Sequence, residues 1–246
     1  GNFLEMIVNE ALGPIPIGNW TPLFQNLGYE ADGETLEIEW YYKNIVEFDR
    51  NSNEEVWTWD PLDHFTMDDY DAYGGSWENA FQSGRYDWTH GNSIWFNEEE
   101  SAIYFSARNL SRITKIDYPS GEIIWMMGLP EEFGTGSENI CTDLRFSYQH
   151  HATILDNGNL LFFDNGNLSR IVNGTDNKVS RIFEVEVIND STCNIVFEYE
   201  LPVDYFSTSM GGVQSLDNGN YLINTRGPVE DGHIFEINQN KEIVWD

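Results

Sequence analysis

One segment of this chain occurs three times, at intervals of about 60 residues. Residues 150–164 (HHATILDNGNLLFFD) return as residues 211–225 (GGVQSLDNGNYLINT), and a version with a degraded turn occupies residues 90–106. Counted back from the turn, His90, His150 and Gly211 fall at roughly equivalent positions. Repetition at a fixed period predicts a repeat architecture, and here each unit can bring a side chain to one shared axis.

Each unit is predicted to contain four strands. The first two flank the Asn-Gly-Asn turn, where Asn-Gly supplies the positive φ angles of a type I′ turn. A second hairpin, rich in β-branched and aromatic residues, follows each inner pair, at residues 45–59, 113–128, 182–200 and 234–246. Four strands per unit is the pattern of a propeller blade. We therefore expect an all-β fold, a β-propeller with four-stranded blades, of which about four are visible.

The expected domain organisation is a single β-propeller domain over residues 1–246, truncated at both ends within blades. Residues 1–9 match the second half of the repeated unit. Either the first and last strands close a small ring, or the intact protein has more blades, and we favour the second. The inserts at 14–34 and 61–87 lack strand alternation and are predicted to be loops on one face. Residues 66–82 could hold a short helix beneath a binding site.

The charge balance restricts the partners. With 42 acidic and 12 basic residues, the formal net charge is -30, which excludes nucleic acid and anionic membrane surfaces as expected partners. A solvated acidic surface in a saline or secreted setting explains this charge best. The alternative is calcium binding at residues 60–71, but EF-hand spacing is missing there. No apolar run approaches the roughly 18 residues of a membrane span, so membrane insertion is not expected.

Two further features fit a secreted, periplasmic or extracellular protein. Five Asn-X-Ser/Thr sequons are candidate glycosylation sites, at Asn19, Asn109, Asn167, Asn173 and Asn189. The two cysteines, Cys141 and Cys193, form either one disulfide or two buried free thiols.

Polar side chains gather at the ends of the inner strands. His90 with Asn92, and His150 with His151, stand at strand starts, and Arg108 follows the second inner strand of the His90 unit. Histidine can act as a nucleophile or proton carrier near neutral pH, and arginine binds an oxyanion with two parallel donors. Together they predict a site at which an anionic group is transferred. Structural hydrogen bonding of the histidines is one alternative. Zinc bound by His90, His150 and His151 is another, although adjacent strand residues point to opposite faces.

These motifs resemble the arylsulfate sulfotransferase (ASST) family. The resemblance covers roughly residues 36–246 and is carried by DWTHGNSI (87–94), SARNLSRITKID (106–117), GEIIWMMG (121–128) and YQHHATILDNGNLLFFDNG (148–166), followed by a YFS…GNYLIN…GHIFEI series. It implies a six-bladed propeller, secreted or periplasmic, that moves a sulfuryl group from an aryl sulfate to a phenol without a nucleotide sulfate donor. It also implies that His150 is the nucleophile that becomes sulfated, with His90, Asn92 and Arg108 holding the sulfate oxygens.

The chain also departs from the family pattern. A further family histidine would fall about seven residues before Gly1. The family's hydroxyl-bearing residues would fall near Ser207, Thr208 and Ser209. In bacterial members a short-range disulfide precedes the nucleophile, in the region of Cys141.

The resemblance implies no cofactor and no metal, and its partners are a small-molecule aryl sulfate and a phenol, with a homo-oligomer left open. The alternative function is a non-catalytic propeller that keeps the scaffold as a binding or surface structural protein.

Overall fold

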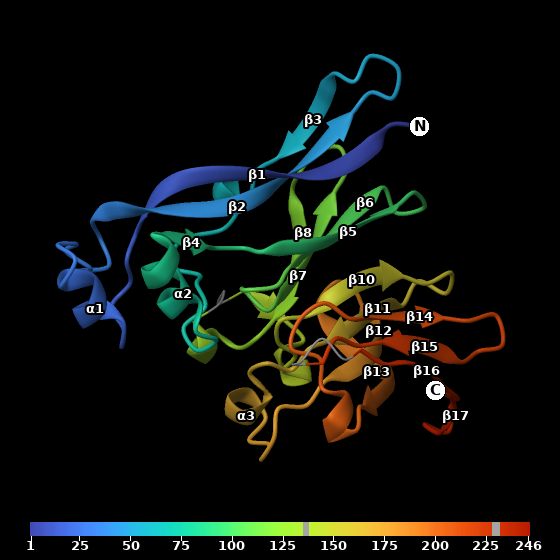
Figure 1. The fold of residues 1–246 in the computed structure, drawn as a ribbon. Helices are drawn as coiled ribbons and strands as arrows, with labels where there is room; N and C mark the ends of the chain where they lie inside the picture. Colours follow the sequence, from blue (N-terminus) through green and yellow to red (C-terminus); the bar gives the residue numbers. More distant parts are fainter. Residues whose placement is uncertain (135–137, 228–231) are drawn as a thin grey trace.

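Four mainly antiparallel sheets follow one another along the chain in the computed structural model, which describes residues 1–134, 138–227 and 232–246 (Figure 1). The first sheet contains β1 (Phe3–Pro14), β2 (Leu36–Phe48), β3 (Glu55–Trp59) and β4 (Arg85–Asp87). The second contains β5 (Gly91–Asn97), β6 (Ala102–Ala107), β7 (Arg112–Asp117), β8 (Ile123–Gly128) and β9 (Asn139–Ile140). The third contains β10 (His150–Ile154), β11 (Leu160–Asp164), β12 (Arg181–Ile188) and β13 (Thr192–Glu200). The fourth contains β14 (Gly212–Ser215), β15 (Tyr221–Asn224), β16 (Ile234–Ile237) and β17 (Ile243–Trp245).

Helices are few and short in the described residues. They are α1 (Thr21–Gln25), α2 (Ser76–Ser83) and α3 (Ser169–Val172), with single 3-10 turns at Pro61–Asp63, Glu131–Phe133, Thr142–Leu144 and Val203–Tyr205. The all-β class is therefore confirmed, three of the sheets have four strands and the second has five, and the short helix expected near residues 66–82 is α2. No sheet closes on itself within the described ranges.

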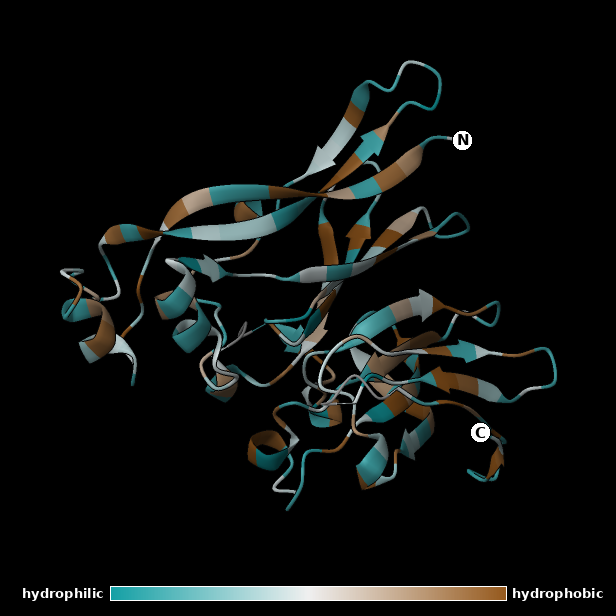
Figure 2. Ribbon diagram, viewed as in Figure 1, coloured by the Kyte–Doolittle hydropathy of each residue, from teal (hydrophilic) through white to brown (hydrophobic). Residues whose placement is uncertain are grey.

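The alternation of side chains explains why successive sheets stack. Every residue of β6 is buried. Ile103 and Phe105 pack into the core against the first sheet, whereas Tyr104 packs into the core against the third. Because neighbouring strand residues point to opposite faces, an apolar strand of this kind serves two interfaces at once. The hydrophobic residues lie mostly on the strands, and the hairpin turns are mainly hydrophilic (Figure 2).

The inner hairpin turns differ from the prediction. Gly158 and Gly219 have φ angles of 83° and 81°, but Asn157 and Asn218 are not among the residues with positive φ. A type I′ turn needs positive φ at both central residues, so that prediction is wrong. Instead the Gly158 N–H donates to the carbonyl of Leu155, and Gly158 takes the left-handed position of a type I turn with a bulge.

The asparagines of these turns bind the neighbouring strand instead. Asn157 and Asn159 both donate to Glu184 on β12. In the same way, Asn218 and Asn220 both donate to Glu236 on β16. The two asparagines of each repeated Asn-Gly-Asn turn thus link the inner hairpin to the third strand of the same sheet by hydrogen bonds.

Two short strands depart from the expected blades. The insert at 61–87 ends in β4, which pairs parallel to β2, so its prediction as a loop throughout is wrong. In the second sheet β9 adds a fifth strand, parallel to β8. Both strands precede the first strand of the next sheet in the sequence.

The starts of the inner strands lie together. β10 contacts β5 on one side and β14 on the other. In Figure 1 the three helices lie at one end of the sheets, and the tight hairpin turns lie at the opposite end. His90 and His150 are at the helix end, because β5 and β10 begin there.

Candidate functional site

His150 is the first residue of β10, and its ring is held at one nitrogen. Its Nδ1 atom lies 2.7 Å from Oδ1 of Asn165 and 3.0 Å from the backbone carbonyl oxygen of Tyr148. Both partners are acceptors, so Nδ1 carries the proton and donates it. The lone pair is therefore on Nε2, which has no hydrogen-bond partner among the described residues. His151, the next residue, is exposed and has a φ of 54°.

Asn165 is oriented by its own partners. Its Nδ2 atom donates to the carbonyl oxygens of Ser207 (3.0 Å) and Met210 (2.8 Å). With both amide hydrogens committed, Oδ1 must face His150. This residue was not predicted from the sequence. The available signal was its place at the end of β11, next to the position equivalent to Arg108 in the repeat.

Burial sets the protonation state of His150. Loss of solvent lowers the pKa of its imidazole from 6.5 to about 4, and the charges of Arg108 and His90 act in the same direction. The hydrogen bonds that His150 donates to Asn165 and to the Tyr148 carbonyl oppose this shift. At neutral pH the ring is therefore uncharged and keeps the lone pair that a nucleophile needs.

Arg108 lies flat against an aromatic ring. Its Cζ atom is 4.1 Å from the centre of the Tyr148 ring, and Nη1 donates to Asn109 Oδ1 at 2.7 Å. The Tyr148 hydroxyl donates to Asp71 Oδ2 at 2.5 Å. A Cβ atom added at Gly74 would lie 1.5 Å from that hydroxyl, so glycine permits this close approach. Burial lowers the pKa of Arg108, and the nearby Tyr148 and Asp71 oppose the shift.

His90 and Arg108 line one cavity of about 250 Å³, which we call the Arg108 cavity. His90 Nδ1 pairs with Asp87 Oδ2, so Nε2 is the nitrogen that can contact a ligand. Helix α2 forms part of the wall. The cavity is also lined by Gly74, Arg85, Tyr148 and Asn167. His150 is not among the described lining residues, although it is close enough for the charges of Arg108 and His90 to act on it.

Asn92 contacts the chain next to His150 rather than the Arg108 cavity. Its Nδ2 atom donates to the carbonyl oxygen of Gln149 at 2.6 Å. Its Oδ1 atom is buried and has no partner among the described residues. The buried Gln149 side chain in turn donates to Ser106 Oγ and to the carbonyls of Ala107 and Arg112. These bonds hold the start of β10 against the strand that leads to Arg108.

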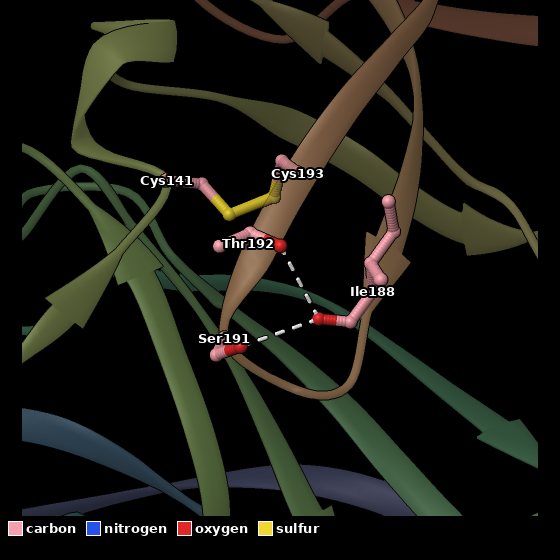
Figure 3. Close-up of a disulfide and its surroundings, with 5 residues drawn as sticks. All are labelled: Cys141, Ile188, Ser191, Thr192 and Cys193. Atoms are coloured by element: carbon pink, nitrogen blue, oxygen red, sulfur yellow. Dashed lines mark hydrogen bonds between the residues drawn. A yellow bond between two sulfur atoms is a disulfide. The ribbon is translucent and has the colours of Figure 1, made fainter.

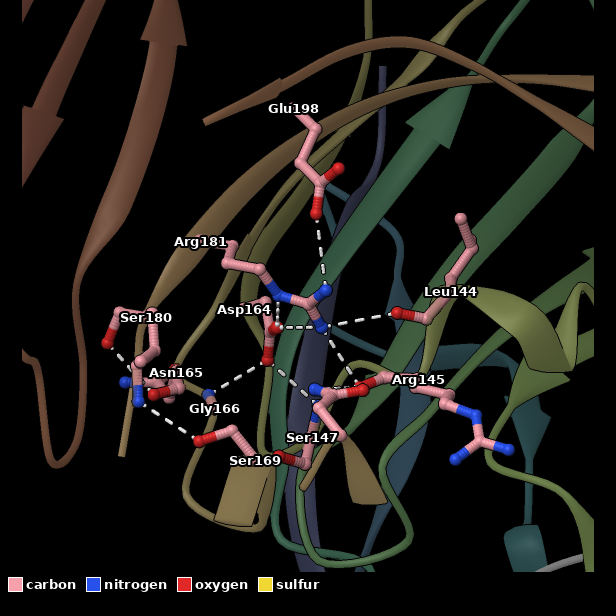
Figure 4. Close-up of polar contacts among 12 residues, drawn as sticks. Leu144, Arg145, Ser147, Asp164, Asn165, Gly166, Ser169, Ser180, Arg181 and Glu198 are labelled. Carbon is pink, nitrogen blue, oxygen red and sulfur yellow. Dashed lines mark hydrogen bonds and ion pairs between the residues drawn. The ribbon is translucent and has the colours of Figure 1, made fainter. Parts of the chain in front are cut away.

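A buried carboxylate anchors the loops around His150 (Figure 4). Asp164 Oδ1 accepts from the backbone N–H groups of Ser147 and Gly166, both at 2.8 Å. Its Oδ2 atom pairs with Arg181, which also donates to the carbonyls of Leu144 and Arg145. Burial raises the pKa of Asp164, and Arg181 opposes that shift. The arrangement fixes both the approach to His150 and the turn that carries Asn165.

A disulfide also holds the segment that precedes His150 (Figure 3). Cys141 and Cys193 are bonded, with their Cα atoms 5.5 Å apart. Cys141 follows β9, at the edge of the second sheet, and Cys193 is on β13, the outer strand of the third. The bond therefore joins two neighbouring sheets, although the cysteines are 52 residues apart in the sequence.

The hydroxyl residues near 207–209 are partly committed to structure. Ser207 is buried, accepts from the Arg226 N–H and donates to the carbonyl of Ser209 at 3.1 Å. Ser207 also supplies one of the carbonyls that orient Asn165.

The sequons differ in their surroundings. Asn19, Asn173 and Asn189 are exposed. Asn109 is only 4% exposed and donates to the Asp87 carbonyl, and Asn167 donates to the carbonyl of Thr208. A glycan on either of these two would displace site contacts, which makes the three exposed positions the candidates that the fold can accommodate.

No group of three His, Cys, Asp or Glu side chains that could hold a metal ion occurs among the described residues. Within the same ranges, no helix is both long and apolar enough to span a bilayer.

Comparisons with known proteins place the chain in a family. No curated protein matches it significantly. Among solved structures it is similar to a protein of unknown function from Bacteroides caccae, at 16% identity and a TM-score of 0.45, over 82% of this chain and 53% of that one. The Arylsulfotransferase (ASST) family model matches residues 29–245, which is most of the chain. The resemblance suggested by the strand-start motifs is thus confirmed, and this chain belongs to the arylsulfotransferase family.

Proposed function

We propose that this protein transfers a sulfuryl group from an aryl sulfate to a phenol, through a sulfated His150. The observation that carries the proposal is the state of the His150 ring. Asn165 and Tyr148 hold the proton on Nδ1. Burial lowers the pKa of the ring to about 4, so the ring is neutral at neutral pH. Nε2 is thereby the nucleophilic atom.

Arg108 and His90 supply the binding contacts of the proposed reaction. A sulfate monoester is an oxyanion, and the planar guanidinium of Arg108 can donate to two of its oxygens. Stacking on Tyr148 limits the orientations of that guanidinium. In a protein of net charge -30, such local positive charge is required to hold an anionic substrate.

The first half-reaction forms a bond between Nε2 of His150 and sulfur. The bond between sulfur and the aryl oxygen breaks, and the phenolate leaves with the electron pair. Because Nδ1 keeps its proton, the sulfated ring gains positive charge, which Asn165 Oδ1 stabilises. In the second half-reaction an acceptor phenol oxygen attacks sulfur, the N–S bond breaks, and the acceptor gives its proton to solvent. One site thus serves donor and acceptor in turn.

Membership of the family also supports a propeller architecture and a secreted or periplasmic location. The four sheets are proposed to be blades of a propeller, because each is mainly antiparallel, has four strands or five, and stacks on the next. A secreted or periplasmic location is proposed from the family, and the Cys141–Cys193 bond agrees with an oxidising compartment.

Turnover tests the proposal. The protein is incubated with 4-nitrophenyl sulfate, with and without phenol, and release of 4-nitrophenol is followed together with formation of phenyl sulfate. We expect release that depends on phenol and is lost in His150→Ala, with His151→Ala as the matched control. Equal phenol-dependent turnover by the His150 variant would contradict the proposal.

A second candidate function is an anion-binding protein without turnover. It is favoured by one observation, that His90 and Arg108 line the Arg108 cavity whereas His150 is not among its described lining residues. Saturable binding of 4-nitrophenyl sulfate that needs Arg108, without product release or a covalent adduct, would support this function instead.

A further inference from the structure

A second cavity adjoins the Arg108 cavity. It has a volume of about 460 Å³ and shares Gly74 and Asn167 with the first. We call it the α3 cavity, because helix α3 and the segment after it form most of its wall. The lining residues that matter here are Tyr73, Arg170, Ile171, Asp176 and Lys178. The two shared residues make the cavities neighbouring parts of one cleft.

The cleft holds a large share of the chain's positive charge. Four of the 12 basic residues line it, Arg85 and Arg108 in the first cavity and Arg170 and Lys178 in the second. Only two of the 42 acidic residues line it, Asp87 and Asp176. Asp87 is already paired with His90. The cleft is thus locally basic in a strongly acidic protein.

These four cations have no carboxylate partner in the described part of the chain. By contrast, Arg112, Lys115 and Arg181 each form an ion pair. A protein with more than three acidic residues for every basic one has ample carboxylates to pair each cation at its surface. Other cations, such as Arg50 and Arg226, also lack an ion pair among the described residues, so it is the gathering of four cations with only two carboxylates around one cleft that indicates an anionic ligand.

The segment that carries Arg170 packs against, and is hydrogen-bonded to, the residues just before His150. Leu168 and Val172 of the α3 region are buried in a cluster with Tyr148. The Leu168 N–H donates to Ser147 Oγ, and the Val179 N–H donates to Ser169 Oγ. The backbone that presents Arg170 and Lys178 is therefore fixed to the residues that precede His150.

The α3 cavity also offers apolar surface beside its charges. Ile171 is 50% exposed and Tyr73 is 47% exposed. An aromatic ring can lie against such side chains while a charged substituent contacts arginine or lysine. The chemistry of the wall fits an aryl group that carries an anion.

We propose that the α3 cavity binds a second anionic group of the aryl substrate, so that the preferred donor is an aryl sulfate bearing a carboxylate or a second sulfate. This inference rests on the proposed function for its catalytic readout. Long-range electrostatics opposes such a preference, because a protein of net charge -30 repels a dianion more strongly than a monoanion. A preference for the dianion therefore has to come from local contacts.

A matched substrate pair tests the inference. The donors are a carboxyaryl sulfate and its methyl ester, compared as a ratio of kcat/KM values at low ionic strength. We expect the wild-type protein to favour the carboxylate by roughly 10-fold, and the double variant Arg170→Gln/Lys178→Gln to abolish the preference. The control Arg50→Gln/Lys241→Gln removes the same two charges from exposed residues of the β2–β3 and β16–β17 turns and should keep the wild-type ratio. The same ratio in the wild-type protein and the double variant overturns the inference.

A binding measurement separates this inference from the proposed function. If neither donor is turned over, the proposed function fails, and calorimetric titration with the carboxyaryl sulfate then decides the subsite. Binding at least several-fold weaker in the double variant than in the Arg50→Gln/Lys241→Gln control supports it. Equal affinity in the two variants overturns it.

Discussion

The Nδ1 atom of His150 lies 2.7 Å from Oδ1 of Asn165, and two backbone carbonyls prevent the Asn165 amide from turning round. This pair decides which nitrogen of the histidine is free. It also places a neutral acceptor where positive charge develops when Nε2 becomes bonded to sulfur.

Removal of the Asn165 side chain should therefore act mainly on kcat. In Asn165→Ala the ring loses its side-chain acceptor and its fixed orientation, and kcat is expected to fall by roughly 10²-fold. KM for the aryl sulfate should change little, because Arg108 and His90 stay in place. The unpaired carbonyls of Ser207 and Met210 should cost about 1–3 kcal/mol of stability. Steady-state kinetics and thermal melting measure the two effects, with the exposed Asn173→Ala as control. Unchanged kcat would remove Asn165 from the account.

Activity should persist to low pH. The pKa of His150 is about 4 in the folded protein and 6.5 when unperturbed, so Nε2 keeps its lone pair at all pH values well above 4. A profile of kcat/KM against pH should stay level below 6.5 and fall only as pH approaches about 4. An acidic limb near 6.5 would contradict the buried, neutral ring.

The same shift affects stability. Between pH 6.5 and about 4 the unfolded chain binds a proton at His150 that the folded protein does not bind. The stabilisation is complete above pH 6.5 and is lost as pH falls towards 4. His150→Ala should therefore show a weaker decrease in melting temperature than the wild-type protein across that interval.

Arg108 should be irreplaceable by lysine. Arg108→Lys keeps the charge but loses the planar pair of donors and most of the stacking on Tyr148. We expect kcat/KM to fall by roughly 10²-fold or more, about 2.7 kcal/mol of transition-state stabilisation. Circular dichroism should show an intact fold. Wild-type kinetics together with a lowered melting temperature would assign Arg108 a structural role only.

The disulfide should contribute to stability rather than to chemistry. Replacing both cysteines, as Cys141→Ser/Cys193→Ser, opens a loop of 52 residues and should cost about 2–5 kcal/mol of unfolding free energy. Denaturant unfolding of the double variant, compared with the oxidised wild-type protein, measures this cost. Equal stability would show that the bond adds nothing to the link between the two sheets.

The periodic parts of the structure could be predicted from the sequence. The outer hairpins are where β-branched and aromatic runs predict them, because each strand has to present apolar residues to its neighbours. The prediction of a type I′ turn was wrong. The Asn157 side chain donates a hydrogen bond to Glu184 on another strand, and the local sequence does not reveal this contact. β4 and β9 were missed because two or three residues carry no periodicity.

The site could be predicted only in part. His90, Arg108 and His150 stand out because repeat position and chemical type agree. The supporting residues Asn165, Tyr148 and Asp71 do not, since their roles depend on contacts over long sequence separations, such as Tyr148 with Asp71. Asn92 has the expected position but contacts Gln149, which depends on how two sheets pack.

The central claim is that His150 carries the sulfuryl group on Nε2. The most direct test is to mix the protein with 4-nitrophenyl sulfate without an acceptor, quench and digest it at alkaline pH, and map adducts by mass spectrometry. We expect an acid-labile SO₃ adduct on the peptide containing His150, assigned to that residue by fragmentation and discharged when phenol is added before the quench. An adduct on another residue, or phenol-dependent turnover with His150 unmodified at every time point, would contradict it.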